Sequence, residues 1–200
     1  TLSDSILNLT AQMGPLGEQD TRTAQLQVQA AEDTTWTTIA TSSLQDMSYT
    51  FPFRVENWDG NRTTPFRVVY NLISGEGLNR TYYQGTIAKN PVKQDSFTVA
   101  AFTGHKCLTG GLKWNRDAIW FPHNELITAV KHHSPDFLFF SGDQIYENDM
   151  TPGDRRSVDK TMLDYLYKWY RWCWAFGELS RDIPTVCIPD DHDVYHGNIW

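Results

Sequence analysis

The sequence predicts a two-domain chain: an all-β sandwich of the fibronectin or immunoglobulin type over residues 1–93, then an α/β region over residues 94–200. Apolar and polar residues alternate along the first half, which is typical of strands with one buried and one solvent-facing side. In the second half, short unbroken apolar runs are separated by helical patterns, which is typical of parallel strands joined by helices. These two patterns together predict the fold class.

Three segments of the first half alternate strictly in polarity. Their apolar positions are Ala24, Leu26, Val28 and Ala30; then Tyr49, Phe51, Phe53 and Val55; then Phe66, Val68, Tyr70 and Leu72. Shorter β-rich runs lie at residues 36–39 and 82–87, and turn-forming residues lie at 59–61 and 74–77. About five short strands at this spacing, without a helical period, indicate a β-sandwich. Residues 1–20 are too polar to assign.

The second half predicts strands and helices in the order βαβαβ. The strands are expected at residues 97–103, 137–140 and 185–188, and the helices at residues 122–130 and 158–179. Because the apolar runs of these strands do not alternate, both faces of the parallel sheet are expected to be covered.

The composition excludes several classes of protein. With 40% hydrophobic and 20% charged residues, the 200-residue chain can bury a core and is not a disordered polyelectrolyte. The net charge of −7 argues against a surface that binds nucleic acid. No apolar run approaches the roughly 20 residues of a membrane span, and no signal-peptide pattern opens the chain. Three cysteines without paired spacing indicate no disulfide framework.

The residue types that bind metals and transfer protons are confined to one half. All six histidines and all three cysteines lie beyond residue 100. The first domain is therefore interpreted as a structural or docking module, with carbohydrate or partner binding as the alternative. Cys173 and Cys187 lie in apolar runs and are interpreted as core residues. His123, His132 and His133, in or beside the first predicted helix, are interpreted as surface or capping residues.

Polar loops follow all three predicted strands of the second half. These loops are residues 104–107, 141–147 and 189–198. Because ligands collect at the carboxyl ends of parallel strands, the three loops are expected to meet at one point. A dinucleotide-binding domain is disfavoured, because no Gly-x-Gly-x-x-Gly motif follows the first strand.

Acidic residues crowd the second and third of these loops. They are Asp143, Glu147, Asp149, Asp190, Asp191 and Asp193. Carboxylates packed together without cations repel one another, so a bound metal is the economical explanation. Carboxylate, imidazole and phenolate ligands suit iron, manganese, zinc, magnesium or calcium rather than copper(I). A solvated loop is the alternative, but it does not explain why each acidic loop directly follows a buried strand.

Two motifs of the second half, SPDFLFFSGDQIYE (134–147) and PDDHDVYHGN (189–198), flank an aromatic-rich helix. On these motifs and this helix rests a resemblance to the alkaline phosphatase D (PhoD-like) family of metallophosphoesterases. It covers most of residues 97–200, and a β-sandwich before the catalytic domain is also usual in this family. The resemblance therefore implies that residues 94–200 are the first part of an α/β metallophosphoesterase domain.

The resemblance implies a centre of two metal ions: iron together with calcium or another divalent cation such as Mn²⁺, Zn²⁺ or Mg²⁺. Asp143 corresponds to the bridging carboxylate, Tyr146 to the phenolate ligand of ferric iron, and Asp191 to a ligand of the second metal. The family usually places a cysteine ligand directly after the first strand. Here His105 replaces that ligand, or Cys107 supplies it through a shifted loop.

The resemblance also implies catalytic roles. His192 corresponds to the catalytic histidine near the leaving oxygen, and Asp191 is expected to be catalytic as well as a metal ligand. Asp190, Asp193 and Asn198 are expected to orient the metal ligands. The family's remaining Asp and His ligands are expected after residue 200. The chain is accordingly expected to be the amino-terminal part of a longer protein.

The function expected from these residues is metal-dependent hydrolysis of a small phosphate ester, either a monoester or a diester, in which metal-activated hydroxide attacks phosphorus. Two alternatives remain: a metal-binding relative whose catalysis is altered, and a surface or glycan-binding protein that acts through its β-sandwich. From the family, the protein is expected to be exported to the periplasm, the extracellular space or the cell surface.

Overall fold

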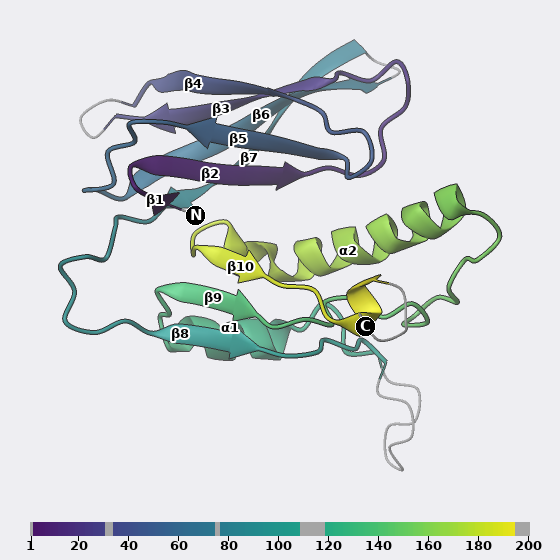
Figure 1. Ribbon diagram of the computed structural model, residues 1–200. Coiled ribbons are helices and arrows are strands. Elements are labelled where there is room, and N and C mark those ends of the chain that lie inside the picture. The colour runs from purple at the N-terminus through teal and green to yellow at the C-terminus, as the bar shows by residue number, and fades with distance from the viewer. Residues whose placement is uncertain (1, 31–33, 75–76, 109–118, 195–200) are drawn as a thin grey trace. The chain divides into compact units, whose positions relative to one another are not determined.

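The chain divides into two compact units (Figure 1). Residues 1–96 and 181–184 form the first unit, and residues 97–180 and 185–200 form the second. The computed structural model describes residues 2–30, 34–74, 77–108 and 119–194. Among these residues, no helix has the length and apolar character needed to span a membrane.

The first unit consists of two antiparallel sheets. The three-stranded sheet has the order β1-β2-β5, formed by Leu2–Ser3, Ile6–Gln12 and Thr50–Val55. The four-stranded sheet has the order β4-β3-β6-β7, formed by Trp36–Ser43, Thr23–Gln29, Thr64–Ser74 and Gly77–Ile87. Strands therefore occupy all three segments in which the sequence alternates, as predicted.

Alternating side chains of both sheets share one hydrophobic core. Phe51 and Phe53 of β5 point into it, as do Leu26 of β3 and Phe66 of β6. Residues two apart on a strand face the same side, so the polarity pattern of the sequence selects which side chains are buried. The core thus follows directly from the alternation.

Two strands lie in the segment that the sequence analysis left unassigned. Leu7, Leu9, Ala11 and Met13 alternate along β2 and beyond it, and all four contribute to the core. The pattern is present in the sequence, but the polar residues between these positions obscure it. The first unit therefore has more strands than the five expected.

The second unit is built on a small parallel sheet with the order β10-β9-β8 (Figure 1). Its strands are Val99–Phe102 (β8), Phe137–Phe140 (β9) and Thr185–Cys187 (β10). Its helices are Asn124–His132 (α1) and Val158–Ser180 (α2), and a short 3₁₀ helix, Asp191–Val194, follows β10. The βαβαβ order is as predicted.

One face of this sheet carries the core of the second unit. Leu138 and Phe140 of β9 are fully buried, and the Phe140 ring packs against Trp172 and Phe176 of α2. The alternate residues of β9, Phe137 and Phe139, are only half-buried. The second face of β9, which the sequence predicts to be covered, is therefore covered only in part. The two helices contact each other through an ion pair between Lys131 and Glu178.

Candidate metal centre

Backbone hydrogen bonds join the loops that follow β8 and β9. The Gly104 N–H donates to the Gly142 carbonyl at 3.3 Å, and the His105 N–H donates to the Asp143 carbonyl at 3.0 Å. The segment after β10 joins the same edge, because the Ile188 N–H donates to the Phe140 carbonyl at 3.0 Å. The loops thus meet at the carboxyl ends of the parallel strands, where ligands usually bind.

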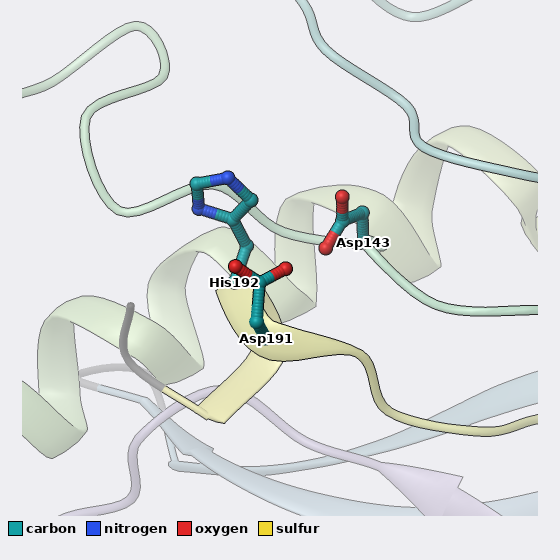
Figure 2. A group of neighbouring side chains, drawn as sticks. All are labelled: Asp143, Asp191 and His192. Carbon is teal, nitrogen blue, oxygen red and sulfur yellow. The ribbon is translucent and has the colours of Figure 1, made fainter. Parts of the chain in front are cut away.

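Asp143, Asp191 and His192 come together at this edge (Figure 2). Each offers one ligand atom, and these atoms lie within 4.8 Å of one another. Figure 2 shows Asp191 and His192 rising from the 3₁₀ helix and Asp143 approaching from the loop after β9. Carboxylate oxygens and an imidazole nitrogen form a donor set that suits a divalent or borderline cation.

A buried carboxylate oxygen without a hydrogen-bond partner indicates that the group suits a cation. The Asp143 Oδ1 atom is buried and has no hydrogen-bond partner within the described residues. A buried carboxylate oxygen without a partner is costly, and a bound cation would supply the missing interaction. The residues present therefore fit a metal ion at this position.

The backbone around Asp143 is unusual. Gly142 has φ of +120°, and a Cβ atom at this position would lie 2.3 Å from the Asp190 Cβ atom. Asp143 has φ of +53°, in the left-handed region that few side chains adopt. Only glycine at position 142 allows the loops after β9 and β10 to approach this closely.

The Asp193 side chain connects the loops after β9 and β10 through hydrogen bonds. Its Oδ2 atom accepts hydrogen bonds from the Asp143 N–H at 2.6 Å and the Asp190 N–H at 3.0 Å, and its Oδ1 atom accepts from the Ile145 N–H at 3.1 Å. Burial raises the pKa of Asp193, and these backbone bonds only partly offset that increase. The Asp190 Oδ1 atom accepts from the Asp191 N–H at 2.9 Å. Both carboxylates therefore hold the backbone of the metal-binding candidates.

Tyr146 lies beside the group. Its hydroxyl donates to the Asp143 Oδ2 atom at 3.1 Å, and its ring centroid lies 4.6 Å from that of His192. Burial, the charge of Asp143 and this hydrogen bond raise the pKa of Tyr146 above its ordinary value. The phenol is thus protonated when no cation is close, and a metal would have to replace this proton to be bound by the phenolate.

A buried carboxylate orients His192. The His192 Nδ1 atom lies 2.7 Å from the Glu147 Oε2 atom, and Glu147 is only 4% exposed. The Tyr165 hydroxyl of α2 donates to the His192 carbonyl at 2.9 Å, which holds the 3₁₀ helix. Burial lowers the pKa of His192, but the hydrogen bond to Glu147 and the nearby carboxylates raise it more, so the pKa lies above its ordinary value.

The sequence alone does not indicate the role of Glu147. It is one of the acidic residues of the loop after β9, but its partner His192 lies 45 positions away in the sequence. Its place directly after Tyr146 is the only local signal.

The His105 side chain does not join the group. It is 8% exposed and packs against the rings of Phe102, Phe140 and Phe176. Its Nδ1 atom has no partner within the described residues. Burial, and secondarily the nearby charge of His123, lowers the pKa of His105 to about 4. The metal-ligand role expected for His105 is therefore not seen, because the imidazole turns into an aromatic pocket.

Cys107, the alternative ligand, lines the same pocket. Its Sγ atom lies 3.9 Å from the His123 Nε2 atom, and its N–H donates to the Asp149 Oδ2 atom at 2.7 Å. Burial, followed by the effect of Asp149, raises the pKa of Cys107 to about 12. His123 is half-buried in this pocket rather than at the surface, although it does occupy the N-cap of α1.

Asp149, expected among the acidic residues of the metal site, is instead a structural group. It is 1% exposed, and its Oδ1 atom accepts from the Leu108 N–H at 3.0 Å. The Arg171 Nη2 atom lies 3.5 Å from its Oδ2 atom. This carboxylate therefore fixes the loop after β8 to α2. Asn198 lies outside the described residues.

Among the comparisons with known proteins, the one with solved structures finds a similar fold. The sequence matches no protein-family model and no curated protein. The structure is similar to a purple acid phosphatase isolated from yellow lupin (Lupinus luteus) seeds, with a TM-score of 0.57 and 11% sequence identity. The similarity covers 94% of this chain and 33% of that one, so the chain spans about a third of the neighbour's length. It shows that the two chains share a fold over this length.

Proposed function

We propose that the chain belongs to a metal-dependent phosphoesterase of the alkaline phosphatase D type, which hydrolyses phosphomonoesters or phosphodiesters. The observation that carries this proposal is the convergence of Asp143, Asp191 and His192 at the carboxyl edge of the parallel sheet. The buried, unpaired Asp143 oxygen and the metallophosphoesterase fold support it.

The chemistry of a phosphate ester accounts for the donor set. Bound cations would neutralise the anionic ester and lower the pKa of a water molecule so that hydroxide is available near neutral pH. Asp143 and Asp191 would hold these ions, and Tyr146 would join them by giving up the proton it now shares with Asp143. Asp193 keeps Asp143 in place through the backbone. A divalent cation such as Mn²⁺ or Zn²⁺, or ferric iron, suits these ligands.

His192 is the proposed general acid. Since its Nδ1 atom is bound to Glu147, the Nε2 atom is the nitrogen that can give a proton to the leaving oxygen. Glu147 favours the protonated imidazole, because a hydrogen-bonded carboxylate stabilises the positive charge. Glu147 is a positioning residue in this proposal.

One observation favours a second candidate, a metal-binding relative with altered catalysis. Neither His105 nor Cys107 reaches the group, so no described residue from the loop after β8 completes the set of ligands. This candidate predicts cation binding without ester hydrolysis. We further propose that the first unit is a fibronectin- or immunoglobulin-like β-sandwich with a structural role, because its two sheets share one core.

Hydrolysis assays test the proposed function. The purified full-length protein, reconstituted with Mn²⁺, Zn²⁺ or iron, is assayed with p-nitrophenyl phosphate and bis(p-nitrophenyl) phosphate before and after chelation. We expect hydrolysis that chelator abolishes and that Asp143→Asn reduces at least a hundredfold, while Asp159→Asn on α2 leaves it unchanged. Activity that is indifferent to chelator, or intact in Asp143→Asn, contradicts the proposal.

A further inference from the structure

A lysine lies next to the candidate metal centre and takes no part in the roles described above. Lys106 follows His105 in the loop after β8, and its side chain is exposed whereas that of His105 is buried. The Lys106 Nζ atom lies 5.7 Å from the centroid of the Tyr146 ring. An ammonium group over a tyrosine face is attracted by the ring, and this attraction restrains an otherwise flexible side chain.

The Tyr146 ring links this ammonium group to the centre. The hydroxyl of the same ring donates to Asp143, and the ring itself lies against His192. The backbone brings the two loops into contact here, because a Cβ atom at Gly104 would lie 2.6 Å from the Tyr146 hydroxyl oxygen. Lys106 is therefore held at the rim of the group formed by Asp143, Asp191 and His192.

Lys106 is also available to an external anion. No ion pair ties it to a carboxylate of the described residues. The carboxylates of the centre would be engaged by cations, and Asp193 is already occupied by backbone N–H groups. Lysine recognises phosphate as a point charge on a flexible stem, and an exposed side chain can reach its ligand without a change in the fold.

We propose that the Lys106 ammonium binds an anionic oxygen of the substrate phosphate and makes the site favour doubly charged phosphomonoesters over singly charged phosphodiesters. This inference rests on the proposed function. At a fixed distance the Coulomb energy is proportional to the charge of the ligand, so a dianion gains about twice as much as a monoanion.

Kinetics of Lys106→Gln tests this specificity. Because this variant loses a charge-assisted contact at an exposed position, we expect KM to rise about tenfold for p-nitrophenyl phosphate and about threefold for bis(p-nitrophenyl) phosphate. The ratio of kcat/KM for monoester over diester therefore falls about threefold. Lys106→Arg retains the preference, because it retains the charge. Lys93→Gln, the control, removes an exposed lysine from the first unit and should leave KM and kcat unchanged for both substrates.

Calorimetry with inorganic phosphate provides a readout besides activity. We expect the metal-loaded Lys106→Gln variant to bind phosphate about tenfold more weakly than the unaltered chain, with equal affinity for the metal alone. Equal phosphate affinity in the two proteins, or an unchanged monoester-to-diester ratio, overturns the role of Lys106. Absence of chelator-sensitive hydrolysis in the unaltered chain refutes the proposed function instead, and the phosphate titration still decides the role of Lys106.

Discussion

Replacing His105 by phenylalanine should make the free energy of unfolding of the second unit depend less strongly on pH. In the folded chain the pKa of His105 is about 4, because burial disfavours the charged imidazole, whereas its ordinary value is 6.5. Between these values the unfolded chain binds a proton that the folded chain does not, so the free energy of unfolding rises with pH. The contribution is lost as pH falls from 6.5 to about 4.

The magnitude follows from this interval. The difference between 6.5 and about 4, at about 1.4 kcal/mol per pH unit, corresponds to about 3 kcal/mol. Phenylalanine keeps the ring contacts with Phe102, Phe140 and Phe176 but cannot take up a proton. It also removes the unpaired Nδ1 atom, so stability at pH 7 should change by less than about 1 kcal/mol.

Urea unfolding at several pH values between 4 and 7 measures the effect. Near-ultraviolet circular dichroism follows the second unit through the stacked rings of Trp169 and Trp172. Other groups titrate in this range, so the quantity of interest is the difference between variant and unaltered chain. The titratable groups that line the same pocket are unchanged in the variant: Cys107, His123, Asp149, Lys168 and Arg171.

The difference in stability loss between the unaltered chain and His105→Phe tests whether His105 is buried as a neutral imidazole. We expect the unaltered chain to lose about 3 kcal/mol more than His105→Phe between pH 7 and pH 4. Equal losses in the two proteins would show that His105 is not buried as a neutral imidazole. The matched control is His132→Phe, which replaces an exposed histidine of α1 that does not line the pocket.

Two further predictions concern the centre itself. Glu147→Gln removes the carboxylate that favours protonated His192, so we expect kcat to fall about 10- to 100-fold. NMR titration should show a lower pKa for His192 in this variant, and an unchanged pKa would contradict the assigned contact. Gly142→Ala places a Cβ atom 2.3 Å from the neighbouring loop at a φ of +120°, so we expect a loss of at least about 2 kcal/mol in thermal or urea unfolding. Gly14→Ala is its control, because a Cβ atom there meets nothing within 4 Å; equal stability of the two variants would refute the packing argument.

Local patterns in the sequence account for most of the strands and helices. Residues 137–140 form a strand as predicted, because a four-residue apolar run before a Gly-Asp turn is too short for a helix. The long helix at Val158–Ser180 likewise follows from uninterrupted helical spacing. Among the strands of the described residues, β1 and β2 are not evident from the sequence, because polar residues mask the alternation from Leu7 to Met13.

Contacts between distant residues account for what the sequence could not reveal. The direction of the His105 side chain depends on aromatic rings from β9 and α2, far along the chain. Asp149 is one of the acidic residues counted near the expected metal site, but in the structure it pairs with Arg171 of α2. Residue type and spacing predicted the edge of the sheet where the group forms, but not which neighbours each side chain contacts.

Direct measurement of cation binding tests the central claim, that Asp143 and Asp191 hold a metal ion beside the proposed general acid His192. The chelator-treated chain is titrated with Mn²⁺ and with Zn²⁺ in a calorimeter, alongside Asp143→Asn and the control Asp159→Asn. Loss of one carboxylate ligand should weaken binding at least tenfold, whereas the control should bind like the unaltered chain. Failure of the unaltered chain to bind either cation, or equal binding by Asp143→Asn, would contradict the account.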